Sequence, residues 1–123
     1  MLVDTELKAF GENIGISDLQ FNDRGCIKFT LENGIIYLEK FENEVFFFFL
    51  KSYELSPLPY ALYKKAFQIA CVENYSEFMP QVVASANNNV GFFVRLPDQN
   101  CDLPNIYKLF KFLIACGERL NEV

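Results

Sequence analysis

The sequence predicts one α+β domain over residues 1–123, in the order helix, three antiparallel strands, helix, two strands, helix. Three observations support this fold class. Three segments carry apolar residues at helical spacing. Between them lie two groups of short apolar runs separated by polar turns, as in β-hairpins. No low-complexity linker or internal repeat divides the chain, so a single domain is expected.

The first helix is expected from Leu2 to Ile14. Asp4 is placed to cap its start, and Gly15 is suited to end it. Gly11 either weakens the helix or lets another segment pack closely against it. The apolar stripe has helical spacing: Val3, Leu7, Phe10 and Ile14.

A three-stranded antiparallel meander is expected from Cys26 to about Tyr53. Residues 26–31 alternate between apolar and polar side chains, and Asn33-Gly34 is a strong hairpin signal. A second strand is expected from Ile35 to Phe41. The polar residues 42–44 then turn the chain into a third strand.

The third strand contains a run of four Phe residues, and side chains alternate across a strand. Its two faces would carry Phe46, Phe48 and Leu50 on one side and Val45, Phe47 and Phe49 on the other. Both faces therefore need cover, because burying one Phe is worth roughly 1.5–3 kcal/mol. Two arrangements remain open: a central strand between two helical layers, or a face that is exposed or covered by a second chain.

The second half begins with a break at Leu55–Pro59 and a helix from Pro59 or Tyr60 to about Val72. A second hairpin pairs Gln81–Ala86 with Val90–Leu96, and residues 87–89, all Asn, form its turn. The apolar face of its second strand is Val90, Phe92, Val94 and Leu96, and the other face is Gly91, Phe93 and Arg95.

The last helix is the longest and is expected from Asp102 to about Leu120. Asp102 can cap it, and Pro104 is tolerated in its first turn. One stripe is apolar or small: Ile106, Phe110, Leu113, Gly117 and Leu120.

The composition argues against several functions. Sixteen acidic residues against eleven basic ones give a net charge of −5, which disfavours nucleic acid as a partner. Histidine is absent, which removes the commonest general base and metal ligand. No phosphate-binding loop or nucleophile motif is present. The carboxylates Glu39, Glu42 and Glu44 are interpreted as a solvated turn. We therefore expect no enzymatic activity, no cofactor and no metal.

The four cysteines lack metal-ligand spacing and are expected to be free thiols. Cys71 and Cys116 lie in helical apolar patterns and are expected to be buried. The N-terminus lacks the features of a signal peptide, and no apolar run is long enough for a membrane span. The expected location is the cytoplasm, without membrane insertion.

The order of these features resembles the class I type III secretion chaperones, the Tir-chaperone-like family of bacteria. An amphipathic first helix leads into Gly15–Leu19, and Asn22–Gly25 precedes the first strand. Leu55–Pro59 separates the meander from the second helix, and Arg95-Leu96-Pro97 closes the last strand before a long C-terminal helix. The resemblance spans nearly the whole chain and depends on the order of its motifs, since none of them is specific alone.

The resemblance implies a homodimeric cytosolic chaperone that keeps a secreted effector soluble and secretion-competent by binding an extended segment near the effector's N-terminus, without ATP. It implies effector contacts on the first helix and the meander: Leu7, Phe10, Leu19, Phe21, Phe29, Leu38, Phe47 and Phe49. It implies a dimer contact on the second helix and fourth strand: Leu62, Tyr63, Ala66, Phe67, Ile69, Ala70 and Val83. The secretion ATPase is a further candidate partner.

Two other functions remain open at this stage. One is a protein-binding adaptor of the same fold that acts outside secretion. The other is a small enzyme or ligand-binding domain, which the absence of histidine and of a phosphate loop disfavours.

Overall fold

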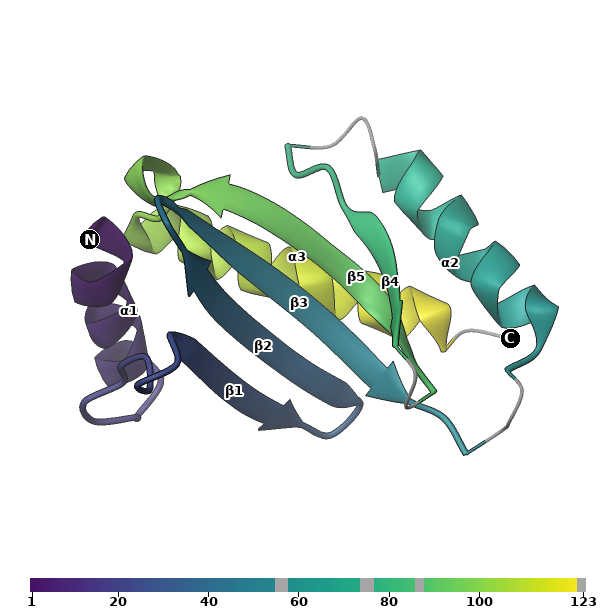
Figure 1. Ribbon diagram of the computed structural model, residues 1–123, viewed down its shortest axis with the longest axis horizontal. Helices are drawn as coiled ribbons and strands as arrows, with labels where there is room; N and C mark the ends of the chain where they lie inside the picture. Colours follow the sequence, from purple (N-terminus) through teal and green to yellow (C-terminus); the bar gives the residue numbers. More distant parts are fainter. Residues whose placement is uncertain (55–57, 74–76, 86–87, 122–123) are drawn as a thin grey trace.

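The computed structural model describes residues 1–54, 58–73, 77–85 and 88–121. Its elements follow the predicted order (Figure 1): α1 Leu2–Asn13, β1 Cys26–Leu31, β2 Gly34–Phe41, β3 Glu44–Ser52, α2 Tyr60–Glu73, β4 Gln81–Ser85, β5 Asn89–Pro97, a 3₁₀ turn η1 Asp98–Asn100, and α3 Leu103–Leu120. The α+β class is confirmed. Residues 55–57 of the predicted break at 55–59 and residue 87 of the predicted turn at 87–89 lie outside the described residues; Asn88, within that turn, has φ +60°.

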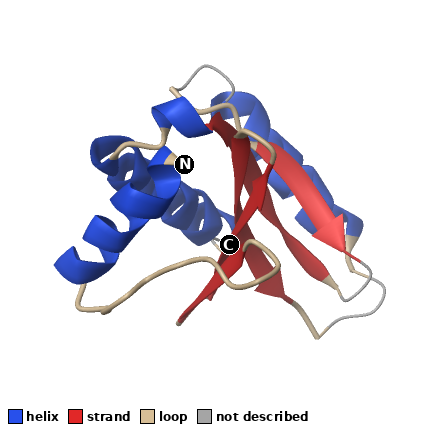
Figure 2. Cartoon of the chain, turned by 60° about the vertical axis from the view of Figure 1, so that its left-hand side comes forward, coloured by secondary structure: helices blue, strands red, loops and turns tan. Residues whose placement is uncertain are grey.

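The two predicted groups of strands form one antiparallel sheet in the order β1-β2-β3-β5-β4. The Phe-rich strand β3 is therefore central, with β2 on one side and β5 on the other. In Figure 1, α3 crosses behind the sheet, α1 lies near one end, and α2 lies beside β4. In the turned view of Figure 2, α1 and α3 lie together on one side of the sheet.

Within the described residues α1 and α3 pack on the same face of the sheet, which we call the inner face. Val45, Phe47 and Phe49 point into it and are fully or almost fully buried. They meet the buried stripe of α3, which includes Leu109 and Leu113. The opposite, outer face carries Phe46, Phe48 and Leu50, all half-buried. The arrangement with helical layers on both faces is thus wrong, because α1 and α3 share one side.

Glycines let the central strand and α3 approach closely around Phe49. A Cβ at Gly117 of α3 would overlap the Phe49 ring, and a Cβ at Gly34 would lie 2.6 Å from the same ring. A Cβ at Gly91 would overlap the carbonyl oxygen of Phe49 in the neighbouring strand. The packing around Phe49, of its ring and of its backbone, therefore depends on three positions that lack a side chain.

The start of α1 differs from expectation. Met1 is its N-cap residue, and Asp4 lies inside the first turn. The cap comes from η1, where the Asp98 carboxylate accepts hydrogen bonds from the backbone N–H of Leu2 at 2.9 Å and of Val3 at 3.0 Å. Helix N-termini leave such N–H groups without intrahelical partners, so Asp98 satisfies two of them across the fold. Gly15, with φ +88°, ends the helix as predicted.

Replacing Asp98 by Ala is expected to lower the free energy of unfolding by about 1 kcal/mol, the usual cost of losing a helix cap. Urea denaturation followed by circular dichroism measures this. Glu12→Ala is the control, because Glu12 is exposed on the same helix and its loss should cost less than about 0.5 kcal/mol. Equal effects of the two variants would contradict the capping role.

The structure tests three further predictions from the sequence. Asp102 caps α3, accepting a hydrogen bond from the backbone N–H of Asn105 at 2.9 Å. The first hairpin turn is one residue earlier than expected, since Leu31 pairs with Gly34. All four cysteines lie in the described residues and none of them forms a disulfide; Cys116 is buried, but Cys71 is exposed because it lies on the outward side of α2.

Candidate functional site

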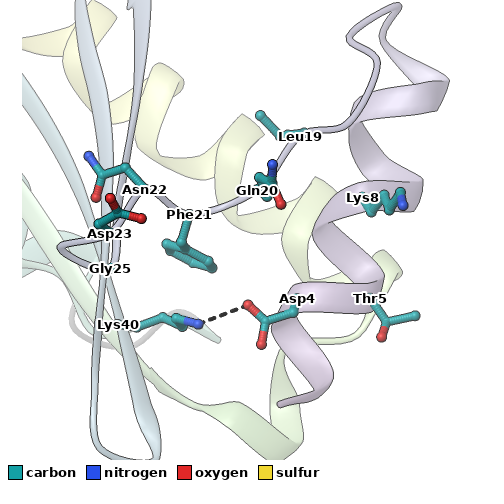
Figure 3. A pocket seen from close by; sticks show the side chains of 10 residues that line it. All are labelled: Asp4, Thr5, Lys8, Leu19, Gln20, Phe21, Asn22, Asp23, Gly25 and Lys40. Atoms are coloured by element: carbon teal, nitrogen blue, oxygen red, sulfur yellow. Dashed lines mark hydrogen bonds and ion pairs between the residues drawn. The ribbon is translucent and has the colours of Figure 1, made fainter.

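A groove of about 810 Å³ lies between the first half of α1 and the connection from α1 to β1 (Figure 3). Leu19 and Phe21 are its large apolar members, and charged side chains surround them. Its lining residues are Asp4, Thr5, Lys8, Leu19, Gln20, Phe21, Asn22, Asp23, Gly25 and Lys40. The groove therefore joins an apolar floor to a polar rim, which suits part of a peptide chain better than a purely apolar ligand.

Gly11 explains how the connection is held against α1. A Cβ there would lie 2.6 Å from the Leu19 Cβ and 2.9 Å from the Ile16 carbonyl oxygen. The Ile16 N–H donates to the Gly11 carbonyl at 2.7 Å, and Asp18 adopts φ +52°. The close-packing interpretation of Gly11 is confirmed. This packing brings Leu19, and then Phe21, beside the helix.

Asn22 directs the chain from the groove into β1. Its side-chain oxygen accepts hydrogen bonds from the N–H of Arg24 at 2.9 Å and of Cys26 at 3.0 Å. Gly25 follows with φ +75°, a conformation that glycine adopts readily. The predicted turn at 22–25 is confirmed, and it fixes the groove at the start of the first strand.

Lys40 of β2 links three parts of the groove (Figure 3). Its ammonium pairs with the Asp4 carboxylate at 2.9 Å and lies 4.7 Å from the centroid of the Phe21 ring. Partial burial acts to raise the pKa of Asp4, but the hydrogen bonds and charges of Lys40 and of the N-terminal ammonium group together outweigh it, so this pKa lies below its usual value. Because such accessible ion pairs contribute little stability, the pair mainly positions Lys40 over Phe21.

An open strand edge adjoins the groove. Within the described residues β1 pairs only with β2, so its other edge has no strand partner. Phe29 of β1 is half-buried and packs edge-on against Phe110 of α3, with ring centroids 5.2 Å apart. An extended peptide can add to such an edge through backbone hydrogen bonds and place alternate side chains into neighbouring pockets.

Three of the eight predicted effector-binding residues are accessible: Leu19 and Phe21 line the groove, and Phe29 lies on the edge strand. The other five require a correction, since they are at most 3% exposed: Leu7, Phe10, Leu38, Phe47 and Phe49. Packing of α1 and α3 on the inner face covers these side chains, so they hold the fold together. Sequence reasoning missed Asp4, Lys8 and Lys40, which are brought to the groove only by tertiary packing.

The predicted dimer residues likewise include both buried and accessible positions. Ala66 and Ile69 are buried in the core and are corrected to core positions. Phe67 is 61% exposed. The remaining four are half-buried: Leu62, Tyr63, Ala70 and Val83. We call the outward side of α2 the α2 face; it lines a shallow, largely apolar depression of about 360 Å³, formed by Tyr60, Tyr63, Lys64, Phe67, Gln68 and Cys71. The helical spacing of 60, 63, 67 and 71 was a usable sequence signal for this face.

Other kinds of site find no support in the part of the chain that the structure describes. No group of three or more His, Cys, Asp or Glu side chains there is arranged to hold a metal ion. None of the helices in the described ranges combines the length and the apolar character needed to cross a membrane.

No family model matches the chain, and no curated protein matches its sequence. Solved structures do match its fold. A chain of the HopA1–SchA chaperone–effector complex superposes with a TM-score of 0.76 at 12% identity, covering 99% of this chain and 94% of that one. A chain of the complex between the Yersinia pestis type III secretion chaperone SycH and a stable fragment of YscM2 gives a TM-score of 0.72 at 14% identity, covering 97% of this chain and 99% of that one. The fold is that of a type III secretion chaperone.

A chain of the ExsC–ExsE complex gives a TM-score of 0.76 at 11% identity, covering 94% of this chain and 88% of that one. These matches confirm the fold that the sequence resemblance implied. At such low identity they describe the path of the backbone, so the role of each side chain has to be argued from this chain's own surface.

Proposed function

We propose that this protein is a non-enzymatic type III secretion chaperone of the bacterial cytoplasm. It binds an extended segment near the N-terminus of a secreted effector and keeps that effector soluble and secretion-competent. The observation that carries the proposal is the fold shared over nearly the whole chain with structures solved as chaperone complexes. The groove beside an open strand edge supplies a surface of the right kind.

The binding mode follows from the two features that adjoin at β1. The effector segment adds to the open edge of β1, so its backbone groups are hydrogen-bonded without any particular sequence. One apolar side chain of the segment lies on Leu19 and Phe21, beneath Lys40. Burial of one such side chain is worth roughly 1.5–3 kcal/mol, so the groove favours apolar segments that would otherwise promote aggregation.

We further propose that the protein is a homodimer through the α2 face, with Phe67 at its centre and Val83 of β4 nearby. Tyr60 is 79% exposed and Phe67 61% exposed. Large aromatic side chains with such exposure are typical of interface anchors. A dimer doubles the length of surface along which an effector segment can bind. The secretion ATPase is proposed as the partner that receives the loaded chaperone.

Phe67→Asp is expected to weaken dimerisation at least ten-fold, because it places a charge at the centre of the α2 face. Sedimentation equilibrium measures the dissociation constant. The monomer should stay folded, since Phe67 does not belong to the core. Lys111→Asp, an exposed position on α3, is the control. A dimer of unchanged strength in Phe67→Asp would contradict the assignment of this face.

The function is tested by affinity purification of the tagged protein from its own bacterium under secretion conditions, followed by mass spectrometry. A stoichiometric secreted protein, held through a region near its N-terminus, is the expected result. Recovery of the protein alone, or only with partners that are not secreted, would overturn the chaperone proposal; the latter result would favour the adaptor function.

A further inference from the structure

The outer face of the sheet carries an aromatic row that the proposed function does not use. Tyr37, Phe48 and Phe93 are in register on β2, β3 and β5. The ring centroids of Tyr37 and Phe48 are 5.8 Å apart, and those of Phe48 and Phe93 are 5.5 Å apart. Phe46 extends the row along β3, 6.5 Å from Phe48. All four side chains are half-buried.

This face is unusual for an antiparallel sheet with one open side, which normally alternates apolar-inward and polar-outward residues. In β3 both faces are apolar. The view of Figure 1 looks onto the outer face, and no helix of the described residues lies in front of it. The Tyr37 hydroxyl is already engaged, since it donates a hydrogen bond to the Cys26 sulfur at 2.7 Å. An uncovered apolar face of this kind marks an interaction surface.

Two charged residues on this face, Glu39 and Arg95, are placed in a self-complementary way. Glu39 and Arg95 are both in register with Phe46, Glu39 on β2 and Arg95 on β5. They therefore lie at equal distances on opposite sides of the central strand. A two-fold rotation about an axis along β3 exchanges the positions of β2 and β5 between two facing sheets. It places each Glu39 opposite an Arg95.

We propose that the outer face packs against the outer face of a second copy of this chain, about a two-fold axis along β3. Phe48 then meets Phe48 of the other copy, and Tyr37 meets its Phe93. Facing sheets pack about 10 Å apart with their strands roughly aligned, which suits this axis. Arg95 also pairs with Glu44 of its own chain at 3.5 Å, so each guanidinium bridges two carboxylates.

The size of the face sets the strength of this contact. Five strands at about 4.8 Å spacing and three rows of side chains give a projected area of about 500 Å². A standard stable interface buries about 800 Å² on each partner. The pairing is therefore weak and concentration-dependent. It is distinct from the contact through the α2 face, so assemblies larger than a dimer are expected at high concentration.

Sedimentation equilibrium of the purified chain alone tests this, in a Phe67→Asp background that removes the proposed α2 contact. Four proteins are compared: the Phe67→Asp parent, and the parent with Glu39→Arg, with Arg95→Glu, or with both changes. The parent is expected to self-associate. Each single reversal should weaken association at least ten-fold by opposing like charges, and the double reversal should restore it to within about three-fold of the parent.

A parent that stays monomeric up to about 1 mM, a free energy of association weaker than about 4 kcal/mol, would overturn the proposal. So would single reversals without effect, or a double reversal that fails to restore association. If Phe48→Glu abolished effector capture while self-association persisted, the face would belong to the effector and the proposal would be overturned. Because no effector is present in the main measurement, its outcome is independent of the chaperone function.

Discussion

Replacing Gly117 by Ala is expected to lower the free energy of unfolding by about 3 kcal/mol or more, at the upper end of the range for overpacked cores. Helix propensity alone predicts the opposite sign, since Ala is favoured over Gly by about 1 kcal/mol inside a helix. The three atoms nearest to a Cβ at Gly117 all belong to the Phe49 ring. That ring also lies against Gly34, which limits how far it can move. Urea denaturation measures the change.

The double variant Phe49→Leu/Gly117→Ala provides the matched control. Phe49→Leu alone is destabilising because it leaves a cavity. Combined with Gly117→Ala, the smaller side chain makes room for the new methyl group. The double variant should therefore lose less stability than the sum of the losses measured for the two single variants. A Gly117→Ala protein as stable as the wild type would show that the core around Phe49 is not packed in this way.

Replacing Phe21 by Asp is expected to weaken effector binding about 100-fold or more while leaving the fold intact. The change removes the apolar floor of the groove, worth roughly 1.5–3 kcal/mol, and puts a charge where the effector side chain must be buried. Phe21 is half-buried and lies beneath Lys40, so an Asp there can pair with the ammonium group. Isothermal titration calorimetry with the captured effector segment measures the loss, and circular dichroism checks the fold.

Phe41→Asp is the matched control for this substitution. Phe41 is 59% exposed at the end of β2 and does not line the groove. Binding within a factor of about three of wild type is expected for it. Equal losses in the two variants would indicate a general effect of added charge, and the groove would lose its assigned role.

The order of elements and the two faces of β5 were predictable because periodicity reports which side of a strand or helix is apolar. The same periodicity does not tell which apolar face is covered. Phe47 and Phe10 look like surface anchors in the sequence, yet both are buried because α1 and α3 share the inner face. Phe47→Asp or Phe10→Asp, natural choices for abolishing binding, are therefore expected to unfold the protein.

Features that depend on contacts between distant segments could not be predicted from the sequence. The cap on α1 comes from Asp98, 96 positions away from Leu2. Lys40 reaches Asp4 and Phe21 only because β2 folds back beside α1. Leu19 and Phe21 were found because the resemblance pointed to the segment before the first strand. The sequence left open whether Gly11 weakens the first helix or allows another segment to pack closely against it. In the structure it allows close packing, which places Leu19 and Phe21 beside α1.

The central claim is that an effector segment binds in an extended form along β1 and the groove at residues 19–25. Hydrogen–deuterium exchange of the chaperone, free and bound to the captured effector, tests it most directly. The account predicts slower exchange of backbone amides between Leu19 and Leu31 in the complex, with little change in α2. Protection confined to α2, with unchanged exchange at residues 19–31, would contradict it.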